Sequence, residues 1–267
     1  MHEQPVELTP LDLQNRLQQA RQLINDGQRE QAFALLRNTL LALQGQDTSH
    51  LSDPMRALRR LTNTIHPVWW NELGDHRVRL RRTKAEDAAF FAQLYADDDW
   101  ARRFNRQQPW SGNLARALDN AGKRPPLETG DIQWIVETPL GQRLGLLSLS
   151  SLDWGNRKAE ISIGMVKGVS GRVTLSAFTH ALRFAFEAVN LNKLYAQVYT
   201  DNPLPRGLLQ RLGFIEEGLL RDHYYLPPGQ FHDVWVLGLT RKDWDSNPHV
   251  RKVARYTDSL TPATATA

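Results

Sequence analysis

The stretch of sequence that decides the fold runs from residue 191 to residue 218 and reads LNKLYAQVYTDNPLPRGLLQRLGFIEEG. The segment KLYAQVYT near its start predicts a β-strand, because aromatic and β-branched residues in alternation are typical of strands. LPRGLLQRL then predicts a helix, and FIEEGLLRDHYY, which begins at residue 214, predicts a second strand. A strand, a helix and another strand in immediate succession indicate a sheet with helices packed on its faces.

The flanking sequence extends this pattern in both directions. Upstream, VRLRR predicts a strand, and residues 84–95 predict a helix. Three further strands are then predicted, at DIQWIVET, QRLGLLSLSSL and AEISIGMV, and a helix over residues 174–189 follows them. Downstream, FHDVWVLGLT predicts a last strand, which the turn at residues 227–229 joins to the one before it. The fold class predicted is therefore α/β (α+β), a mixed sheet flanked by helices.

Residues 10–45 carry no strand signal and predict helices. Apolar residues recur at helical spacing on both sides of a break at Gly27. The pairing of Gly27 with Ala32 across this break resembles the second half of a tetratricopeptide unit, in which a small residue lets two antiparallel helices approach closely. A third helix is expected to begin at Ser52 or Asp53. We expect a small helical bundle here, or alternatively a surface that recruits a protein partner.

These patterns divide the chain into four parts. We expect a helical domain over residues 1–66, a linker over 67–76, an α/β domain over 77–245 and a flexible tail over 246–267.

Composition narrows the functional classes. The chain has no Cys, which excludes disulfides, thiolate metal sites and a Cys nucleophile and is consistent with a cytoplasmic protein. No run of about 18 apolar residues predicts a membrane span, and the N-terminus does not have the pattern of a secretory signal. The net charge of +4 suits an anionic ligand but is weak evidence for nucleic acid, so no nucleic-acid partner is expected. No set of His, Asp and Glu has metal-ligand spacing, so no metal is expected.

The order of elements, together with four phrases, resembles the GNAT superfamily of acetyl-CoA-dependent N-acetyltransferases, nearest the branch that modifies protein N-termini and nucleotide-sugar amines. The resemblance covers residues 77–244, and its phrases are KAEISIGM, ALRFAFEAVNLNKLYAQV, DNPLPRGLLQRLGFIEEG and GLLRDHYYLPPGQFHDVWVLGL. It implies that the strand at AEISIGMV diverges from the strand at KLYAQVYT and that the pantetheine arm of acyl-CoA lies between them. It also implies that the CoA pyrophosphate binds at the N-terminus of the following helix, where backbone N–H groups are unpaired.

The loop before that helix departs from the family pattern. The three positions that the family fills with Arg or Gln, Gly, and Gly or Ala align without a gap on Val169, Arg172 and Thr174, and none matches. The Arg172 guanidinium could hold a phosphate by other means, or the same side chain could fill the space and exclude the cofactor. The expected cofactor-binding residues are Met165, Val166, Gly168, Ser170, Gly171, Arg172, Val173, Thr174 and Asn202.

The acid–base residues implied by the resemblance are also altered. A Glu that serves as base in related enzymes corresponds to Gln197, and the positions of a Tyr or Ser acid correspond to Leu209 and Pro205, which cannot donate a proton. Glu160 remains as a candidate base, or as a structural carboxylate that binds neighbouring backbone.

The hairpin beside the expected acceptor groove supplies the other candidates. His223 could act as a base, and Tyr225 or Tyr224 as an acid; His232 lies on the same hairpin. Aromatic residues that alternate along a strand also serve for packing. The catalytic residues predicted are Glu160, His223 and Tyr225.

Two functional hypotheses follow. The first is an acyl-CoA-dependent N-acyltransferase with acetyl-CoA or another acyl-CoA as co-substrate, acting on a small-molecule amine, an amino sugar or a protein N-terminus. The second is a GNAT-fold adaptor that has lost catalysis and recruits a protein partner through its helical N-terminal region.

Overall fold

The computed structural model describes residues 8–104, 113–226 and 229–246. Contacts between Cα atoms divide the chain into two units, Met1–Trp69 and Trp70–Ala267. The predicted C-terminal tail lies outside the described residues, apart from Ser246.

The first unit consists of three helices, α1 (Pro10–Asn25), α2 (Arg29–Ala42) and α3 (Ser52–Thr64), with short 3₁₀ turns at Ser49–Leu51 and Pro67–Trp69. Thr9 and Asp12 form a capping box at the start of α1, which satisfies N–H groups that have no partner within the helix. Gly27 lies between α1 and α2 with a φ of 77°, a conformation that favours glycine. The prediction of N-terminal helices is confirmed; the tetratricopeptide-like character stays a prediction.

Apolar side chains of all three helices form one core in this unit. Its fully or largely buried members are Leu8, Leu13, Leu17, Ala20, Ala32, Leu36, Leu43, Leu51, Met55, Leu58 and Ile65. Ala20 and Ala32 are completely buried, so the helices pack closely at these two small residues.

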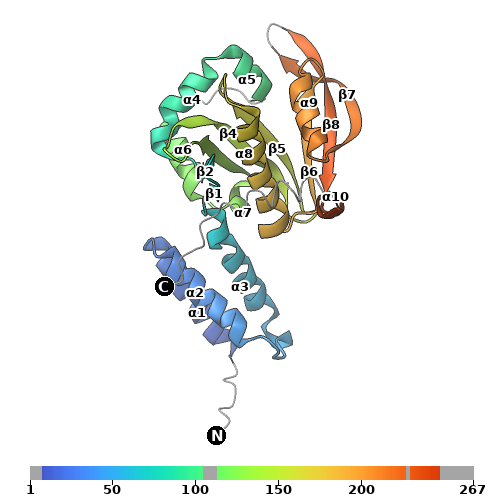
Figure 1. The fold of residues 1–267 in the computed structure, drawn as a ribbon. Coiled ribbons are helices and arrows are strands. Elements are labelled where there is room, and N and C mark those ends of the chain that lie inside the picture. The colour runs from blue at the N-terminus through green and yellow to red at the C-terminus, as the bar shows by residue number, and fades with distance from the viewer. Residues whose placement is uncertain (1–7, 105–112, 227–228, 247–267) are drawn as a thin grey trace. The chain divides into compact units, whose positions relative to one another are not determined.

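The second unit is built on one mixed sheet of eight strands (Figure 1), in the order β1-β2-β3-β4-β5-β6-β8-β7. The strands are β1 (Leu73–Gly74), β2 (Arg79–Arg82), β3 (Ile132–Glu137), β4 (Arg143–Asp153), β5 (Lys158–Met165), β6 (Lys193–Tyr199), β7 (Ile215–Leu226) and β8 (Gln230–Thr240). Among the described strands, β5 and β6 form the one parallel pair, and their crossover is the helix α8. The predicted mixed sheet is confirmed.

Helices cover both faces of this sheet. They are α4 (Ala88–Tyr95, preceded by the 3₁₀ turn Ala85–Asp87), α5 (Asp98–Phe104), α6 (Leu114–Lys123), α7 (Pro126–Thr129), α8 (Gly171–Arg183, continued by a π-helical turn over Phe184–Ala188), α9 (Pro203–Arg211) and α10 (Arg241–Ser246). Helices α4 and α6 pack on Ile135 and Leu146, whereas the neighbouring Trp134 contacts Phe184. Because successive strand residues point to opposite faces, α4 and α6 cover one face and α8 the other.

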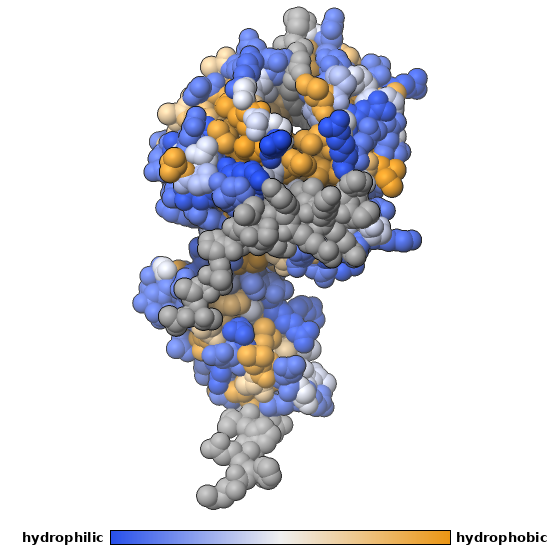
Figure 2. Space-filling view, viewed as in Figure 1, coloured by the Kyte–Doolittle hydropathy of each residue, from blue (hydrophilic) through white to orange (hydrophobic). Residues whose placement is uncertain are grey.

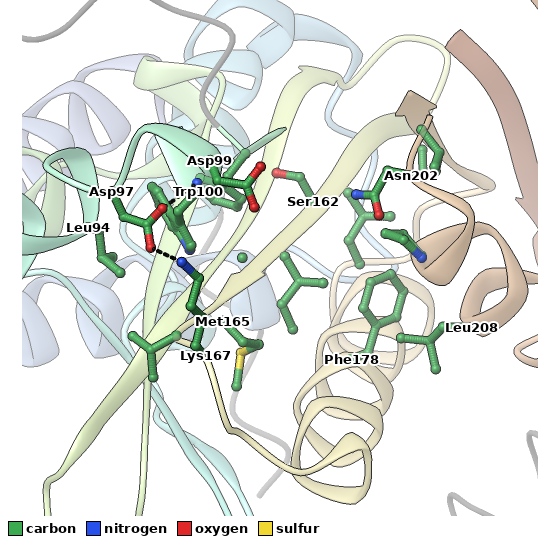
Figure 3. Close-up of a pocket in the computed structure, with 18 of the residues that line it drawn as sticks. Leu94, Asp97, Asp99, Trp100, Ser162, Met165, Lys167, Phe178, Asn202 and Leu208 are labelled. Carbon is green, nitrogen blue, oxygen red and sulfur yellow. Dashed lines mark hydrogen bonds and ion pairs between the residues drawn. The ribbon is translucent and has the colours of Figure 1, made fainter. Parts of the chain in front are cut away.

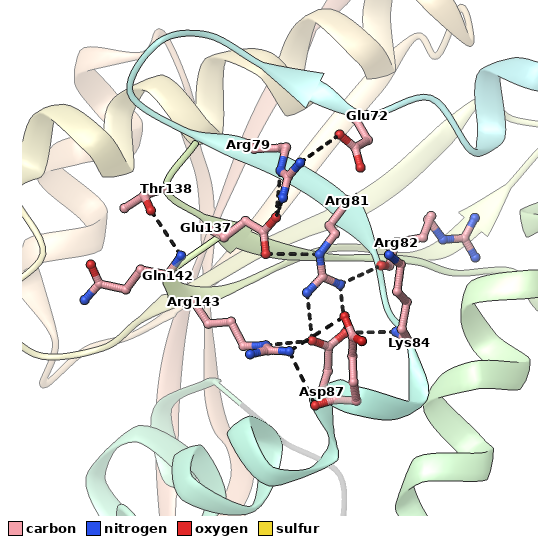
Figure 4. Close-up of polar contacts among 11 residues, drawn as sticks. Glu72, Arg79, Arg81, Arg82, Lys84, Asp87, Glu137, Thr138, Gln142 and Arg143 are labelled. Atoms are coloured by element: carbon pink, nitrogen blue, oxygen red, sulfur yellow. Dashed lines mark hydrogen bonds and ion pairs between the residues drawn. The ribbon is translucent and has the colours of Figure 1, made fainter. Parts of the chain in front are cut away.

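Charged side chains are buried where β2, β3 and β4 meet the turn before α4 (Figure 4). The Arg81 guanidinium donates to both carboxylate oxygens of Asp87 at 2.8 Å and to Glu137 at 3.0 Å. Arg143 donates to the same Asp87 carboxylate at 2.8 Å, and the Lys84 backbone N–H does so as well. We call Arg81, Asp87, Glu137 and Arg143 the buried network; it ties β2, β3 and β4 to the turn before α4.

Candidate functional site

Strands β5 and β6 separate part of the way along their length. Their parallel pairing covers Lys158–Glu160 opposite Lys193–Tyr195 and stops there, although β5 continues to Met165 and β6 to Tyr199. Backbone N–H and C=O groups that line such a gap must find partners in water, side chains or a ligand. The divergence expected between these two strands is therefore present, and it opens the middle of the sheet.

A cavity of about 960 Å³ lies at this opening, and its volume is at the upper end of the range for small-molecule sites. Its walls come from α4 and α5 on one side, the diverging ends of β5 and β6, and helices α8 and α9 on the other (Figure 3). The polar residues among those that line it are Gln93, Asp97, Asp99, Gln142, Arg143, Ser162, Lys167, Gln197, Tyr199 and Asn202. Figure 2 shows a hollow in this unit that is bordered by both hydrophobic and hydrophilic surface.

Helix α5 forms one wall by packing directly on the backbone of β5. A Cβ atom at Gly164 would lie 2.7 Å from the Phe104 ring and 2.9 Å from the Trp100 ring, so only glycine permits this approach. The buried indole N–H of Trp100 has no hydrogen-bond partner in the structure, and Trp100 lines the cavity. A buried donor without a partner is costly, so Trp100 offers a hydrogen bond that a ligand oxygen would complete. No pattern in the sequence predicted that α5 forms a wall of the cavity.

The loop from Lys167 to Ser170 leads from the cavity to the first turn of α8. Gly168 has a φ of 87°, and an added Cβ would meet no atom there or at Gly171, so space surrounds this loop. The Ser170 hydroxyl caps the helix by accepting the Val173 N–H at 3.4 Å. Arg172 is exposed and is not among the described residues that line the cavity. The guanidinium therefore does not fill the gap between β5 and β6.

The structure brings only part of the predicted cofactor set to the cavity. Met165, Val166 and Asn202 line it. Residues of the predicted set that lie in the loop and first turn of α8 are outside the cavity lining: Gly168, Ser170, Gly171, Arg172, Val173 and Thr174. Their contact with a cofactor stays a prediction.

Opposite charges meet at the edge of the cavity (Figure 3). The Lys167 Nζ lies 3.0 Å from the Asp97 Oδ2, and the side chain of Lys167 is 82% exposed. This contact raises the pKa of Lys167 and, with the Trp100 backbone N–H, lowers the pKa of Asp97. Asp99 lies on the same wall. No sequence pattern predicted a role for Lys167, Asp97 or Asp99.

The predicted catalytic residues lie around the cavity without lining it. Glu160 is half-buried at the last paired position of β5, and alternation places it on the same face as the cavity residue Ser162. His223 is exposed, with its ring 4.6 Å from that of Tyr224. Tyr225 is 62% exposed and packs on Phe231. Their catalytic roles stay predictions.

Tyr224 reaches the cavity wall where its neighbour Tyr225 does not. Its hydroxyl donates to the Oε1 of Gln197 at 2.5 Å, and its ring packs against Tyr199, which also lines the cavity. Gln197, Leu209 and Pro205, the positions at which the sequence departs from the family's acid and base, all line the cavity.

Within the described ranges, His, Asp and Glu side chains do not gather in groups of three or more that could hold a metal ion. None of the described helices has both the length and the apolar character needed to cross a membrane.

Comparisons with known proteins agree with this geometry. The family model of the acetyltransferase (GNAT) domain matches residues 77–215. A protein of Bacillus subtilis named "Putative ribosomal N-acetyltransferase YdaF" is 35% identical over 39% of this chain and 57% of its own length. The spermidine N(1)-acetyltransferase of Vibrio cholerae is 28% identical over 40% of this chain and 62% of its own length. The chain thus spans about three fifths of each of these two relatives.

A solved structure gives the same fold. RimJ of Mycobacterium smegmatis, in complex with CoA-disulfide, superposes with a TM-score of 0.61 at 24% identity, over 72% of this chain and 98% of that one.

Proposed function

The chain belongs to the GNAT acetyltransferase family, and on that premise we propose that it transfers an acyl group, in the first instance acetyl, from acyl-CoA to a primary amine. The observation that carries the proposal is the end of β5–β6 pairing after Glu160, because it opens a cavity whose lining reaches Lys167, in the loop that leads to the N-terminus of α8. A slot between strands that ends near a helix N-terminus suits a long ligand with a phosphate at one end.

The residues present fit acyl-CoA. The open space at Gly168 and Gly171 leaves room for a diphosphate at the start of α8, and the unpartnered Trp100 N–H is a donor for an oxygen of the ligand. Asn202, on the opposite wall from Trp100, offers an amide that can orient the pantetheine arm (Figure 3). Acyl-CoA supplies a thioester carbonyl, at which an amine forms the new C–N bond as the C–S bond breaks.

The chain's own residues then have to move two protons. A base takes a proton from the amine, and Glu160, at the last paired position of β5, or His223 is the candidate. An acid returns a proton to the leaving sulfur. Tyr224 is our candidate for the acid because its hydroxyl already points to Gln197 on the cavity wall.

The acceptor is proposed to be cationic before it reacts. Asp97 and Asp99 place two carboxylates on the α5 side of the cavity, and Trp100, which directly follows Asp99 in the sequence, lines the same wall. Carboxylates and an aromatic ring are the groups that recognise a protonated amine. A polyamine and a protein N-terminus both satisfy this description.

The direct test is an assay of thiol release from acetyl-CoA with a panel of amines, with mass spectrometry to identify the acetylated product. We expect release above the amine-free rate for at least one cationic amine. The adaptor hypothesis predicts no amine-dependent release with any acyl-CoA, and that result would overturn the transferase proposal.

The adjacent residues Tyr224 and Tyr225 allow a matched pair of substitutions that tests which hydroxyl donates the proton. Tyr224→Phe is expected to lower kcat about 100-fold or more, because general acid catalysis contributes about 10²–10⁴-fold, while the affinity for CoA stays within twofold. Tyr225→Phe removes the same hydroxyl from an exposed residue that does not line the cavity. A smaller loss of kcat in this variant assigns the acid to Tyr224, and a larger loss assigns it to Tyr225. Equal effects of the two substitutions would contradict the assignment of Tyr224.

A further inference from the structure

We propose that Lys167 changes partners during the reaction cycle: it binds Asp97 in the free protein and a phosphate group of CoA in the complex, so that cofactor binding releases the Asp97 carboxylate for the acceptor amine. The inference rests on the proposed function, because it assigns a role to two residues of that same cavity.

Asp97 is the fixed member of the pair. Its Oδ1 accepts the backbone N–H of Trp100 at 3.1 Å, which caps the first turn of α5. Helix α5 is in turn held against β5 by the contact of Trp100 and Phe104 with Gly164. The Asp97 carboxylate therefore keeps its place on the cavity wall whether or not a cation is bound.

Lys167 is the movable member. Its side chain is 82% exposed, and its one ion pair among the described residues is the one with Asp97. It lies between Val166, which lines the cavity, and Gly168, whose backbone is in the left-handed region. The flexible four-carbon chain of a lysine at this place can point either to α5 or to the loop that leads to Ser170 at the start of α8.

The energies favour an exchange. An exposed ion pair of this kind adds little to stability, so little is lost when it opens. A phosphate carries more negative charge than a carboxylate and accepts stronger, charge-assisted hydrogen bonds. The loop also lacks a cation at Val169, the position where the family has Arg or Gln, so Lys167 is the lining residue best placed to supply one.

The exchange couples the two ends of the cavity. When Lys167 leaves, the Asp97 carboxylate faces the acceptor side without the ammonium group that paired with it. A protonated amine then binds more tightly than it does to the free protein. Because coupling between two binding sites is reciprocal, a bound amine must also strengthen CoA binding.

The first test measures the affinity for CoA by titration calorimetry. Lys167→Ala is expected to weaken binding about 3- to 10-fold, and Lys167→Arg to retain it. Asp97→Asn is expected to tighten binding about 2- to 5-fold, because the lysine no longer has to leave a partner. In the double variant, Asp97→Asn is expected to add nothing to Lys167→Ala, because there is then no lysine to release.

Matched controls separate exchange from general electrostatics. Lys123 and Asp119 on α6 form an exposed ion pair of the same type away from the cavity, and Lys123→Ala and Asp119→Asn are expected to leave CoA affinity unchanged. Asp99→Asn removes a cavity carboxylate that does not form the ion pair. Two results would refute the exchange, because the long-range electrostatic field of the carboxylates would then explain the effect. One is that Asp99→Asn tightens CoA binding as much as Asp97→Asn does. The other is that Asp97→Asn tightens CoA binding equally in the Lys167→Ala background.

The second test follows the Asp97 carboxylate itself by NMR titration. In the free protein Lys167 holds the pKa of Asp97 below its usual range, so saturating CoA is expected to raise that pKa in the wild type. A rise of equal size in Lys167→Ala, or no rise in the wild type, would overturn the proposal. Dephospho-CoA repeats both tests: if the Lys167 effect persists, the partner is the diphosphate, and if it disappears, the partner is the 3′-phosphate.

Failure of this inference and failure of the proposed function give different results. A wild-type protein that binds CoA and releases thiol, but is insensitive to Lys167→Ala, refutes the exchange alone. A wild-type protein that binds no CoA refutes both.

Discussion

Two groups of ion pairs in the second unit use the same chemistry in opposite settings. In the buried network, the side chains of Arg81 and Asp87 are 7% and 0% exposed, and Asp87 accepts hydrogen bonds from two arginines and a backbone N–H (Figure 4). At the cavity, one exposed lysine meets one carboxylate (Figure 3). The first arrangement allows a single geometry, whereas the second can open at little cost.

The difference shows how burial separates structure from function in charged residues. A buried charge that loses its partner cannot turn to water, so its contacts are permanent. An exposed pair is replaced by water or by a ligand with a small change in free energy. Arg143 belongs to both regions, because it donates to Asp87 and also lines the cavity. The buried network thus fixes Arg143, which forms part of the cavity wall.

The largest expected effect comes from breaking the buried network. Asp87→Asn is expected to lower the free energy of unfolding by about 3–5 kcal/mol, because it removes a buried carboxylate that pairs with both Arg81 and Arg143 and leaves Glu137 to balance the buried charge of Arg81. Chemical denaturation measures the change. Glu86→Gln is the matched control, since Glu86 is the exposed neighbour and its loss is expected to cost less than about 1 kcal/mol. Equal costs would remove the distinction between the two regions.

Low pH is expected to destabilise the buried network in the wild-type protein as well. Burial alone would raise the pKa of Asp87, but hydrogen bonds from Arg81 and Arg143 outweigh it and hold the pKa below its usual value of about 4. A depressed folded-state pKa gives stability that is complete above about pH 4 and is lost as the pH falls through the folded value. Thermal unfolding between pH 3 and 7 should show this loss, and Asp87→Asn should flatten it. A profile that is unchanged in Asp87→Asn would contradict the assignment.

The cavity pair provides the contrasting measurement. Asp97→Asn and Lys167→Ala are each expected to leave the free energy of unfolding almost unchanged, because water replaces the lost contact. The same denaturation experiment measures both. A loss as large as that expected for Asp87→Asn would show that the pair holds the fold and is not free to exchange.

Arg172 is expected to have the smallest effect. Its side chain is exposed at the second residue of α8, so its guanidinium can approach a phosphate only from outside the cavity. Arg172→Ala is expected to weaken CoA binding about twofold to threefold, as for an exposed charge–charge contact. Tighter binding in this variant would mean that Arg172 blocks the cofactor after all.

Much of the fold follows from the sequence because its signals are local. Alternating apolar residues identify β3 to β8, and the break at Gly27 separates α1 from α2. The two-residue strand β1 is too short to show any period, and it lies in the segment predicted as a linker.

The site was harder to predict because it depends on contacts between distant segments. Alternation along β7 does not predict which tyrosine faces the cavity, because the strand contains a bulge. From Leu220 to Tyr224, β7 advances four residues, whereas the paired residues of β8 advance only two, from Val234 to His232. This bulge re-aims the side chains, and it turns Tyr224 towards Gln197. The position of Trp100 against Gly164 is likewise set by the packing of α5, which no local pattern encodes.

The central claim is that the space between the diverging ends of β5 and β6 binds acyl-CoA. Its most direct test is the melting temperature of the wild-type protein as acetyl-CoA is raised into the millimolar range. The account predicts a rise that grows with concentration, about 5 °C or more at a hundredfold excess over Kd, since the ligand binds the native state alone. A melting temperature unchanged by acetyl-CoA, longer acyl-CoAs and free CoA would contradict the account.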